Sequence, residues 1–265
     1  MEDLAFIENN LIDIVSKARI FFIDIESHCS NLDIKEKSYQ DYVTKLDIEI
    51  QKYLIDSISI IFPGFEIYSE ENIKDVTKLK NKCFVIDPLD GTLNFISGIP
   101  YFCISVAYVD HGIPKVGVTY DPNNNEIFHA FHGGGFFINR KKFGGHSNSS
   151  KIIAISNDFL GMCIDKNPII IKKLRNYGKI RILGSQALHL AYVSAGRILA
   201  CINHEAKYWD DVAGFVMLKE SGLDYKSFRG EIIFPKYEID PRQNLNSLCG
   251  EEKIMHEITK IINDL

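Results

Sequence analysis

The chain has 265 residues, of which 46% are hydrophobic and 25% are charged, and its formal net charge is −5. This composition is typical of a globular protein and excludes a disordered chain. No cluster of Lys and Arg offers the phosphate-neutralising surface of a nucleic-acid-binding protein. No apolar stretch approaches the roughly eighteen residues of a membrane-spanning helix. We therefore expect an enzyme or a small-molecule-binding protein without nucleic-acid or membrane partners.

The six cysteines are scattered along the chain, without a CxxC pair or a Cys/His cluster at zinc-ligand spacing. Cys83, Cys103 and Cys201 lie within apolar, strand-like runs, where a reduced thiol packs as a small hydrophobic group. The acidic start of the chain lacks the basic and then apolar segments of a secretion signal. These features predict reduced cysteines and a cytoplasmic location.

The first part of the chain is typical of two helices followed by a sheet. Apolar residues recur at helical spacing from Leu4 to Ala18, which predicts an amphipathic helix that runs into Phe22. A polar loop is expected at 28–40 and a second helix at 41–61. Short β-type runs separated by turn signals then predict a largely antiparallel sheet with strands at 65–68, 83–86, 102–109, 115–120 and 126–131.

After Gly144 and Gly145 the pattern changes to an alternation of strands and helices. The expected order is strand 152–156, helix 168–177, strand 180–183, helix 185–195, strand 199–203 and helix 212–221. Such an alternation favours α/β winding. We expect an N-terminal α+β part at residues 1–145 and a C-terminal α/β part at residues 146–265.

The strongest motif, Asp87-Pro-Leu-Asp-Gly-Thr92, follows directly after an apolar strand. Asp87 and Asp90, three residues apart on a Pro-Gly turn, can converge on one hard cation, and the carbonyl of Leu89 can add another oxygen ligand. A helix that begins near Thr92 would direct free N–H groups at a phosphate beside the metal. The alternative is a turn in which an aspartate only caps the backbone.

Three further segments place acidic residues at the ends of predicted elements. The pair at 70–71 ends a strand, and the pair at 210–211 begins a helix directly after Trp209. The alternatives are a solvated strand edge for the first pair and a helix N-cap for the second. In the third segment, 41–47, Thr44 and Asp47 also fit a capping box. Each segment is ambiguous alone.

Together, in this order and spacing, the four segments resemble the inositol monophosphatase family, within the wider group of magnesium-dependent, lithium-sensitive phosphatases. The resemblance also includes 117–122, 133–139 and 184–197, so that it covers nearly the whole chain. It implies a layered αβαβα fold with the active site in the cleft between the two parts. It further implies Mg²⁺-dependent hydrolysis of a small phosphate monoester, sensitivity to lithium and a homodimer.

The resemblance assigns metal ligands to the matching positions. Glu70, Asp87 and the carbonyl of Leu89 correspond to ligands of a first Mg²⁺. Asp87 then bridges to a second Mg²⁺, to which Asp90 and Asp210 correspond as further ligands. A third, weaker ion near Glu70 is usual in the family. Two such ions can stabilise both the attacking and the leaving oxygen of a phosphoryl transfer.

The resemblance also implies which residues handle water and substrate. Thr92, hydrogen-bonded to Asp47, would orient the attacking water and accept its proton in general-base fashion. Backbone N–H groups of Gly91 and Thr92 would hold the phosphate. Gly184 and Ser185 would contact the substrate through backbone groups, and Ser185 also fits a helix N-cap.

One position departs from the family pattern. Many members that hydrolyse inositol phosphates have a glutamate seven residues before the aspartate of the Trp-Asp pair, whereas this chain has Asn203. An asparagine can bond hydroxyl groups but brings no charge, and Glu205 could replace the glutamate only if the loop is shifted. Inositol monophosphate is the leading substrate class, and a 3′(2′),5′-bisphosphate nucleotide or fructose 1,6-bisphosphate is the alternative.

Three other residues have weaker assignments. Lys37 lies about where the family often has a lysine near the phosphate, and a solvated loop lysine is the alternative. Asp211 is left outside the ligand set, because similar proteins use the acid directly after the tryptophan. Glu71 is also left outside, because the corresponding residue in similar proteins does not bind the metal directly.

Rival classes explain less of the sequence. A haloacid-dehalogenase-type phosphatase uses a D-x-D-G-T motif with an aspartate nucleophile, whereas the two aspartates here are three residues apart. The glycine-rich 132–135 stretch lacks the G-x-S-x-G partner of a lipase and is better explained by a hairpin turn. A non-catalytic regulatory protein on the same fold is the alternative of another class, but all the acids that catalysis requires are present.

Overall fold

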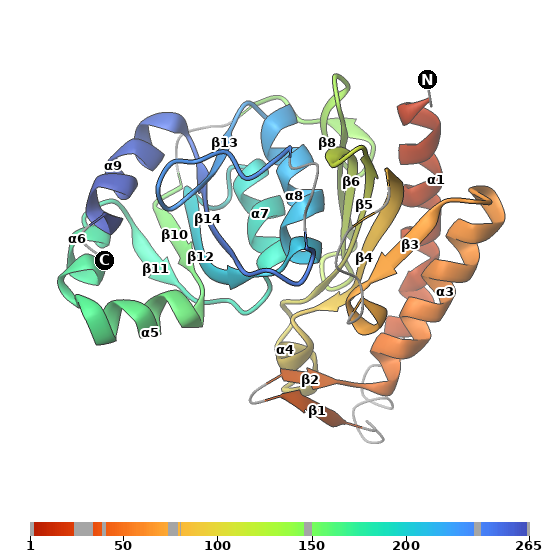
Figure 1. Cartoon of the computed structure of the whole chain (residues 1–265), viewed down its shortest axis with the longest axis horizontal. Coiled ribbons are helices and arrows are strands. Elements are labelled where there is room, and N and C mark those ends of the chain that lie inside the picture. The colour runs from red at the N-terminus through yellow and green to blue at the C-terminus, as the bar shows by residue number, and fades with distance from the viewer. Residues whose placement is uncertain are drawn as a thin grey trace.

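A computed structural model describes residues 3–23, 34–38, 41–73, 79, 81–145, 150–235 and 240–263 of the chain. Helices and two large sheets alternate in layers (Figure 1). Hydrophobic cores lie between the outer N-terminal helices and the first sheet, around the central helices, and between the second sheet and the outer C-terminal helices. The predicted αβαβα sandwich is confirmed.

The first layer consists of α1 (Leu4–Lys17), which continues into the 3₁₀ turn η1 (Ala18–Phe22), and of α3 (Lys45–Ile61). Asp3 caps α1 by accepting a hydrogen bond from the N–H of Phe6 at 3.1 Å. Each helix buries one apolar stripe against the first sheet, as the helical spacing predicts. The stripe residues include Leu11, Val15, Ile50, Leu54 and Ile58.

The first sheet has seven strands in sequential order. They are β3 (Glu66–Ser69), β4 (Lys82–Asp90), β5 (Cys103–Asp110), β6 (Ile113–Asp121), β7 (Glu126–Phe131), β8 (Gly135–Ile138) and β9 (Lys141–Lys142). Only the β3–β4 pair is parallel among these neighbours, so the prediction of a largely antiparallel sheet is confirmed. The β8–β9 hairpin extends the sheet beyond the predicted strands.

Two helices, α7 (Gln186–Ser194) and α8 (Tyr208–Glu220), lie between the sheets. Glycine permits their close approach. A Cβ atom on Gly117 of β6 would lie 2.3 Å from the carbonyl oxygen of Ala213, and one on Gly214 of α8 would lie 2.4 Å from the Cβ of Leu190 in α7. Contacts this short exclude any side chain at these two positions.

The second sheet has the strand order β11 (Lys179–Arg181), β10 (Ile152–Ile155), β12 (Ala200–Ala206), β14 (Leu245–Gly250) and β13 (Asp224–Ser227). β10 pairs in parallel with β11 and β12, which confirms the predicted α/β alternation. β14 pairs antiparallel with β12 and β13, and was not predicted. The outer face carries α5 (Asn157–Lys166), α6 (Ile169–Leu174) and α9 (Glu252–Ile262).

The start of α3 differs from the prediction. Residues 41–43 form a strand, β2 (Asp41–Val43), which pairs with β1 (Lys35–Ser38). Thr44 is extended, with φ −113°, and its capping box with Asp47 sets the helix start at Lys45. The prediction of a helix from residue 41 and of a continuous loop over 35–38 was therefore wrong. Residues 28–33 and 39–40 of that loop lie outside the described residues.

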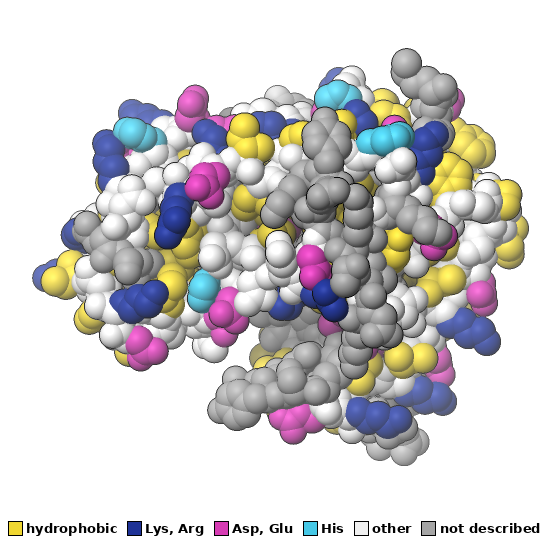
Figure 2. All heavy atoms as spheres, viewed as in Figure 1, with side chains coloured by type: hydrophobic (Ala, Val, Ile, Leu, Met, Phe, Trp, Pro, Cys, Tyr) yellow, Lys and Arg dark blue, Asp and Glu magenta, His cyan; other side chains and the backbone are white. Residues whose placement is uncertain are grey.

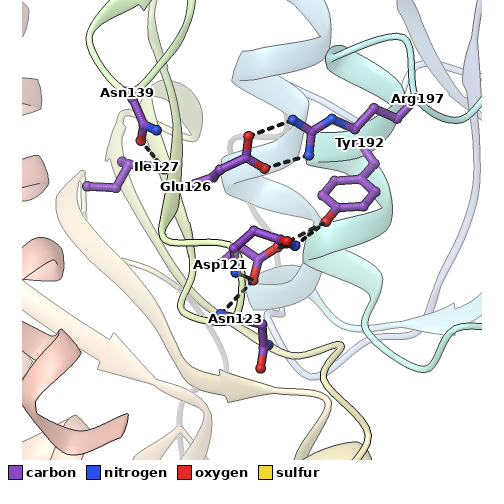
Figure 3. Close-up of polar contacts among 8 residues, drawn as sticks. Asp121, Asn123, Glu126, Ile127, Asn139, Tyr192 and Arg197 are labelled. Carbon is purple, nitrogen blue, oxygen red and sulfur yellow. Dashed lines mark hydrogen bonds and ion pairs between the residues drawn. The ribbon is translucent and has the colours of Figure 1, made fainter. Parts of the chain in front are cut away.

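A polar cluster ties the β6–β7 hairpin to the C-terminal end of α7 (Figure 3). The hydroxyl of Tyr192 donates to Asp121 at 3.0 Å and accepts from the side-chain amide of Asn124 at 3.1 Å. The guanidinium of Arg197 makes two hydrogen bonds to Glu126, at 2.6 and 2.7 Å, and lies 4.8 Å from the centre of the Tyr192 ring. Bidentate pairs of this kind fix both the distance and the relative orientation of the two segments that they join.

The described residues contain no helix with the length and apolar character needed to span a membrane. The five described cysteines, Cys83, Cys103, Cys163, Cys201 and Cys249, are buried free thiols, as predicted. Cys29 lies outside the described residues. The proposed division of the chain near residue 145 stays a prediction.

The close packing of α7 and α8 leads to a test with a matched pair of helix glycines. Gly214→Ala should lower the free energy of unfolding by about 1–3 kcal/mol, because the new methyl group overlaps Leu190. Gly161→Ala in α5 has open space and should raise it by about 0.5–1 kcal/mol. Urea denaturation measures both. A Gly214→Ala protein as stable as the parent chain would contradict the close approach of the two helices.

Candidate active site

Three of the predicted metal ligands meet at one point. Each of Asp87, Asp90 and Asp210 offers a carboxylate oxygen, and the three oxygens lie within 4.8 Å of one another. Asp87 and Asp90 end β4, and Asp210 lies in the first turn of α8. Asp87 is buried, and the other two are half-buried. Convergent carboxylates at this spacing are a donor set suited to a hard cation.

A β-bulge brings the two aspartates of β4 together. Asp87 pairs with Ser105 of β5 and Asp90 pairs with Cys103, so that three steps along β4 match two steps along β5. In a regular strand, residues three apart would point to opposite faces of the sheet. The N–H of Leu89 donates to the Asp87 carboxylate at 3.0 Å within the bulge. The motif therefore lies at the irregular end of a strand and not on the free turn that the sequence predicts.

Burial and mutual repulsion dominate the electrostatics of this cluster. Burial raises the pKa of Asp87 well above its usual range, and the charges of Glu70, Asp90 and Asp210 raise it further. The pKa of Asp210 is also raised well above its usual range, by burial first and then by Asp90. Glu70, the first residue of η2 (Glu70–Asn72) after β3, is close enough to act on both. A bound cation would relieve this repulsion, so the residues present fit a metal site.

Asp90 is held by the start of α7. One of its oxygens, Oδ2, accepts hydrogen bonds at 2.6 Å from both the Ser185 hydroxyl and the backbone N–H of Ala187. Burial raises the pKa of Asp90 to about 6, and these two hydrogen bonds act in the opposite direction. Ser185 precedes α7 but makes no capping hydrogen bond with its own side chain. Ser185 thus occupies the N-cap position, as predicted, but the carboxylate of Asp90 replaces its side chain as the acceptor for the N–H of Ala187.

Asp210 and Asp211 have different environments. Asp210 accepts a hydrogen bond from the N–H of Lys207 at 2.8 Å and contributes to the acidic cluster. Asp211 is fully buried and accepts from the side chains of Gln186 at 2.7 Å and Tyr225 at 2.6 Å. Because both oxygens of Asp211 are engaged, it is a structural link between α7, α8 and β13.

Asp47 both caps α3 and reaches the motif. Its Oδ2 accepts from the N–H of Thr44 at 2.8 Å in the capping box, and its Oδ1 lies 3.1 Å from the hydroxyl of Thr92. The same hydroxyl lies 3.0 Å from the carbonyl oxygen of Leu89. Burial raises the pKa of Asp47. The structural and the functional interpretations of Asp47 are thus compatible, because they use different oxygens.

Gly91 and Gly184 lie against each other beside Thr92. Gly91 has φ +95° and precedes α4 (Thr92–Ile96), and a Cβ atom there would lie 3.0 Å from the carbonyl oxygen of Tyr101 and 3.2 Å from that of Gly184. The side-chain amide of Asn94 joins the two segments through hydrogen bonds to Tyr101 at 2.7 Å and to Leu183 at 2.6 Å. The first N–H groups of α4 have no acceptor within their own helix.

A sequence profile of the inositol monophosphatase family matches residues 9–263. The chain belongs to the inositol monophosphatase family. It is therefore a phosphoric monoester hydrolase by family. The expectation drawn from the motifs is confirmed over nearly the whole chain.

Named members of the family share much of the sequence. A protein of Thermotoga maritima named fructose-1,6-bisphosphatase/inositol-1-monophosphatase is 34% identical over 247 residues, which cover 90% of each chain. The Nus factor SuhB of Escherichia coli is 34% identical over 204 residues, which cover 75% of this chain and 76% of the relative. The crystal structure of the extragenic suppressor protein suhB from Bartonella henselae is 28% identical, with a TM-score of 0.83 over 97% of this chain and 98% of that one.

The residues predicted to contact the substrate differ in their exposure to solvent. Asn203, in β12, is buried with 7% of its surface exposed, whereas Glu205 is exposed and has φ +74°. Ser185 is buried and its hydroxyl is engaged by Asp90. The backbone of Lys37 belongs to β1, and its side chain lies outside the described residues. The substrate roles of these residues in this family member stay predictions.

Sequence reasoning missed the residues that hold the ligands in place. Asn94, Ala187 and Cys103 form polar contacts around Asp90 and Gly91 from three separate elements, and no spacing rule connects them. One local signal was present for the bulge. Pro88 cannot donate a ladder hydrogen bond, and proline within a strand pattern is typical of bulges.

Proposed function

We propose that the protein catalyses the Mg²⁺-dependent hydrolysis of a small phosphate monoester, with inositol monophosphate as the leading substrate. The observation that carries this proposal is the convergence of Asp87, Asp90 and Asp210 within 4.8 Å, with Glu70 near enough to raise the pKa of two of them. Four neighbouring acids, of which Asp87 is buried and the others are half-buried, are costly without a cation. Phosphate-transferring sites bind Mg²⁺ through a few carboxylates.

The chain offers ligands for two to three Mg²⁺ ions. Glu70, Asp87 and the carbonyl oxygen of Leu89 would hold the first ion. Asp87, Asp90 and Asp210 would hold the second, and a third would lie near Glu70. Inhibition by lithium is proposed from the family resemblance alone, and a cytoplasmic location from the sequence alone.

Bound Mg²⁺ supplies the Lewis acidity that activates a water molecule and neutralises charge on the leaving oxygen. The side chains beside it handle the proton. Thr92 can accept a proton from the attacking water while its own hydroxyl proton passes to Asp47, 3.1 Å away. The raised pKa of Asp47 favours this transfer. The N–H groups of Gly91 and Thr92 would hold the phosphate oxygens at the start of α4.

The neutral side chain of Asn203 bears on the class of substrate. Asn203 places a neutral amide where many inositol phosphatases of the family have a carboxylate, so the site does not repel a second anionic group there. Fructose 1,6-bisphosphate and a 3′(2′),5′-bisphosphate nucleotide are therefore the alternative substrates. On the face viewed in Figure 2, Lys and Arg side chains are scattered among acidic ones, which favours a small metabolite over nucleic acid.

The first test is phosphate release from inositol 1-phosphate, fructose 1,6-bisphosphate and adenosine 3′,5′-bisphosphate, with Mg²⁺ and with EDTA. We expect metal-dependent release with a preference for one substrate.

Asp87→Asn should lower kcat/KM by about 10³-fold, because it removes the charge shared between two ions. Near-parental activity of Asp87→Asn at saturating Mg²⁺ would contradict the two-ion site. No release by folded protein would favour a regulatory role of the kind that the name of the relative SuhB, Nus factor, indicates.

A second variant tests the proton path. Thr92→Ala should lower kcat by about 10²-fold, because the water loses the group that accepts its proton. Its affinity for Mg²⁺ should stay close to that of the parent, since Thr92 offers no carboxylate to the metal. Titration of the rate against Mg²⁺ separates the two quantities. A variant with normal kcat would exclude Thr92 from proton transfer.

We also propose that the protein is a homodimer. Leu93 of α4, Ile99 and Ile182 expose 53%, 49% and 43% of their surface, and Asn94 joins their two segments. Neighbouring exposed apolar side chains are typical of an interface. Sedimentation velocity should give a dimer for the parent chain and a monomer for Leu93→Glu. A monomeric parent chain would contradict the proposal.

A further inference from the structure

The carboxylate of Asp90 is held by donors at the start of α7. Oδ2 accepts from the Ser185 hydroxyl and the Ala187 N–H, both at 2.6 Å, and the thiol of Cys103 lies 3.9 Å from the same oxygen. Short hydrogen bonds to a carboxylate are strong and directional. The backbone N–H of Leu188 is also close enough to lower the pKa of Asp90. The first turn of α7 therefore holds this carboxylate through several donors.

Ser185 is enclosed on all sides. Only 1% of its surface is exposed, and its hydroxyl lies between Asp90 and the thiol of Cys103, 3.6 Å away. A hydroxyl enclosed in this way is not accessible to a molecule bound from solvent. The side chain of Ser185 therefore faces the carboxylate and not the substrate.

The helix that carries Ser185 is fixed at its other end. Tyr192 is bonded to Asp121, and Arg197, three residues after the end of α7, is bonded to Glu126 through two hydrogen bonds (Figure 3). Leu190 also packs against Gly214 of α8 without room for a side chain between them. Since α7 is held along its length, its first residues cannot follow Asp90 if that side chain rotates.

We infer that Ser185 is a positioning residue for Asp90, which holds the carboxylate in the orientation in which it meets Asp87 and Asp210 at the metal cluster. This inference rests on the proposed metal site and gives the hydroxyl a role of its own, whereas the resemblance implies a substrate contact through backbone groups only. Groups that orient a metal ligand without touching the metal are worth about 10–100-fold in metal affinity or activity. Ser185 and the Ala187 N–H share this task, so the lower end of the range applies.

The inference can be tested with metal affinity as the readout. Trp209, the only tryptophan, directly precedes Asp210, so excitation of Trp209 should sensitise the luminescence of Tb³⁺ bound at the cluster. Mg²⁺ added in competition then gives its affinity without any turnover. Ser185→Ala and Ser185→Gly should each weaken Tb³⁺ and Mg²⁺ binding by about tenfold. Ser185→Thr, which keeps the hydroxyl, should restore affinity, and KM for the phosphate ester at saturating Mg²⁺ should stay unchanged.

Ser194 provides a matched control. It is a fully buried serine of the same helix, and its hydroxyl donates only to the carbonyl of Leu190 at 2.9 Å. Ser194→Ala should leave metal affinity unchanged, and circular dichroism should show that every variant is folded. Unchanged metal affinity in folded Ser185→Ala and Ser185→Gly would overturn the inference. A raised KM in these variants would then indicate that Ser185 contacts the substrate.

The metal site itself is checked separately in the parent chain. Its Tb³⁺ signal should disappear on Asp87→Asn. A parent chain without such a signal would refute the proposed metal site, and with it this role of Ser185. A normal parent signal with unchanged Ser185 variants would refute only the positioning role.

Discussion

Repulsion between carboxylates that are buried together is the constraint on which the rest of the structure depends. Asp87, Asp90 and Asp210 lie within reach of one cation, and Glu70 acts on the same group. Isolated carboxylates would avoid such a place, because burial penalises their charged form. The surrounding fold must therefore supply rigidity and hydrogen-bond donors that keep the charges in position. The packed layers, the bulge in β4 and the start of α7 all help to keep these carboxylates in position.

The acids come from elements that are distant in the sequence, and close packing brings these elements together. β3 and β4 run in parallel, which places Glu70 beside the end of β4. α8 approaches β6 and α7 at Gly117 and Gly214, and so delivers Asp210 to the same edge. The site therefore depends on the same glycines that determine the distance between the layers. The contacts at Tyr192 and Arg197 keep α7 in register with the first sheet.

Local patterns predicted a large part of this structure, and contacts between distant elements account for most of what they missed. The spacing of apolar residues was sufficient for α1, because it reports one buried face. Thr44 and Asp47 fitted a capping box, which indicates a helix start at Lys45, although the helix was predicted from residue 41. α5 and β14 went unpredicted because their burial comes from packing in the core of the second sheet. The hydrogen bond from Ser185 to Asp90 joins residues 95 positions apart, and no local pattern encodes it.

The bulge in β4 also constrains how this chain can vary in length. Because three steps on β4 match two on β5, the spacing between Asp87 and Asp90 is part of the pairing of the two strands. Loss of one residue there would restore a regular ladder but move the start of α4, with Gly91 and Thr92, by one position. Gain of one residue would turn one aspartate toward the opposite face of the sheet. A change of length at this bulge would therefore alter the separation of two charges, whereas one in a distant hairpin would not.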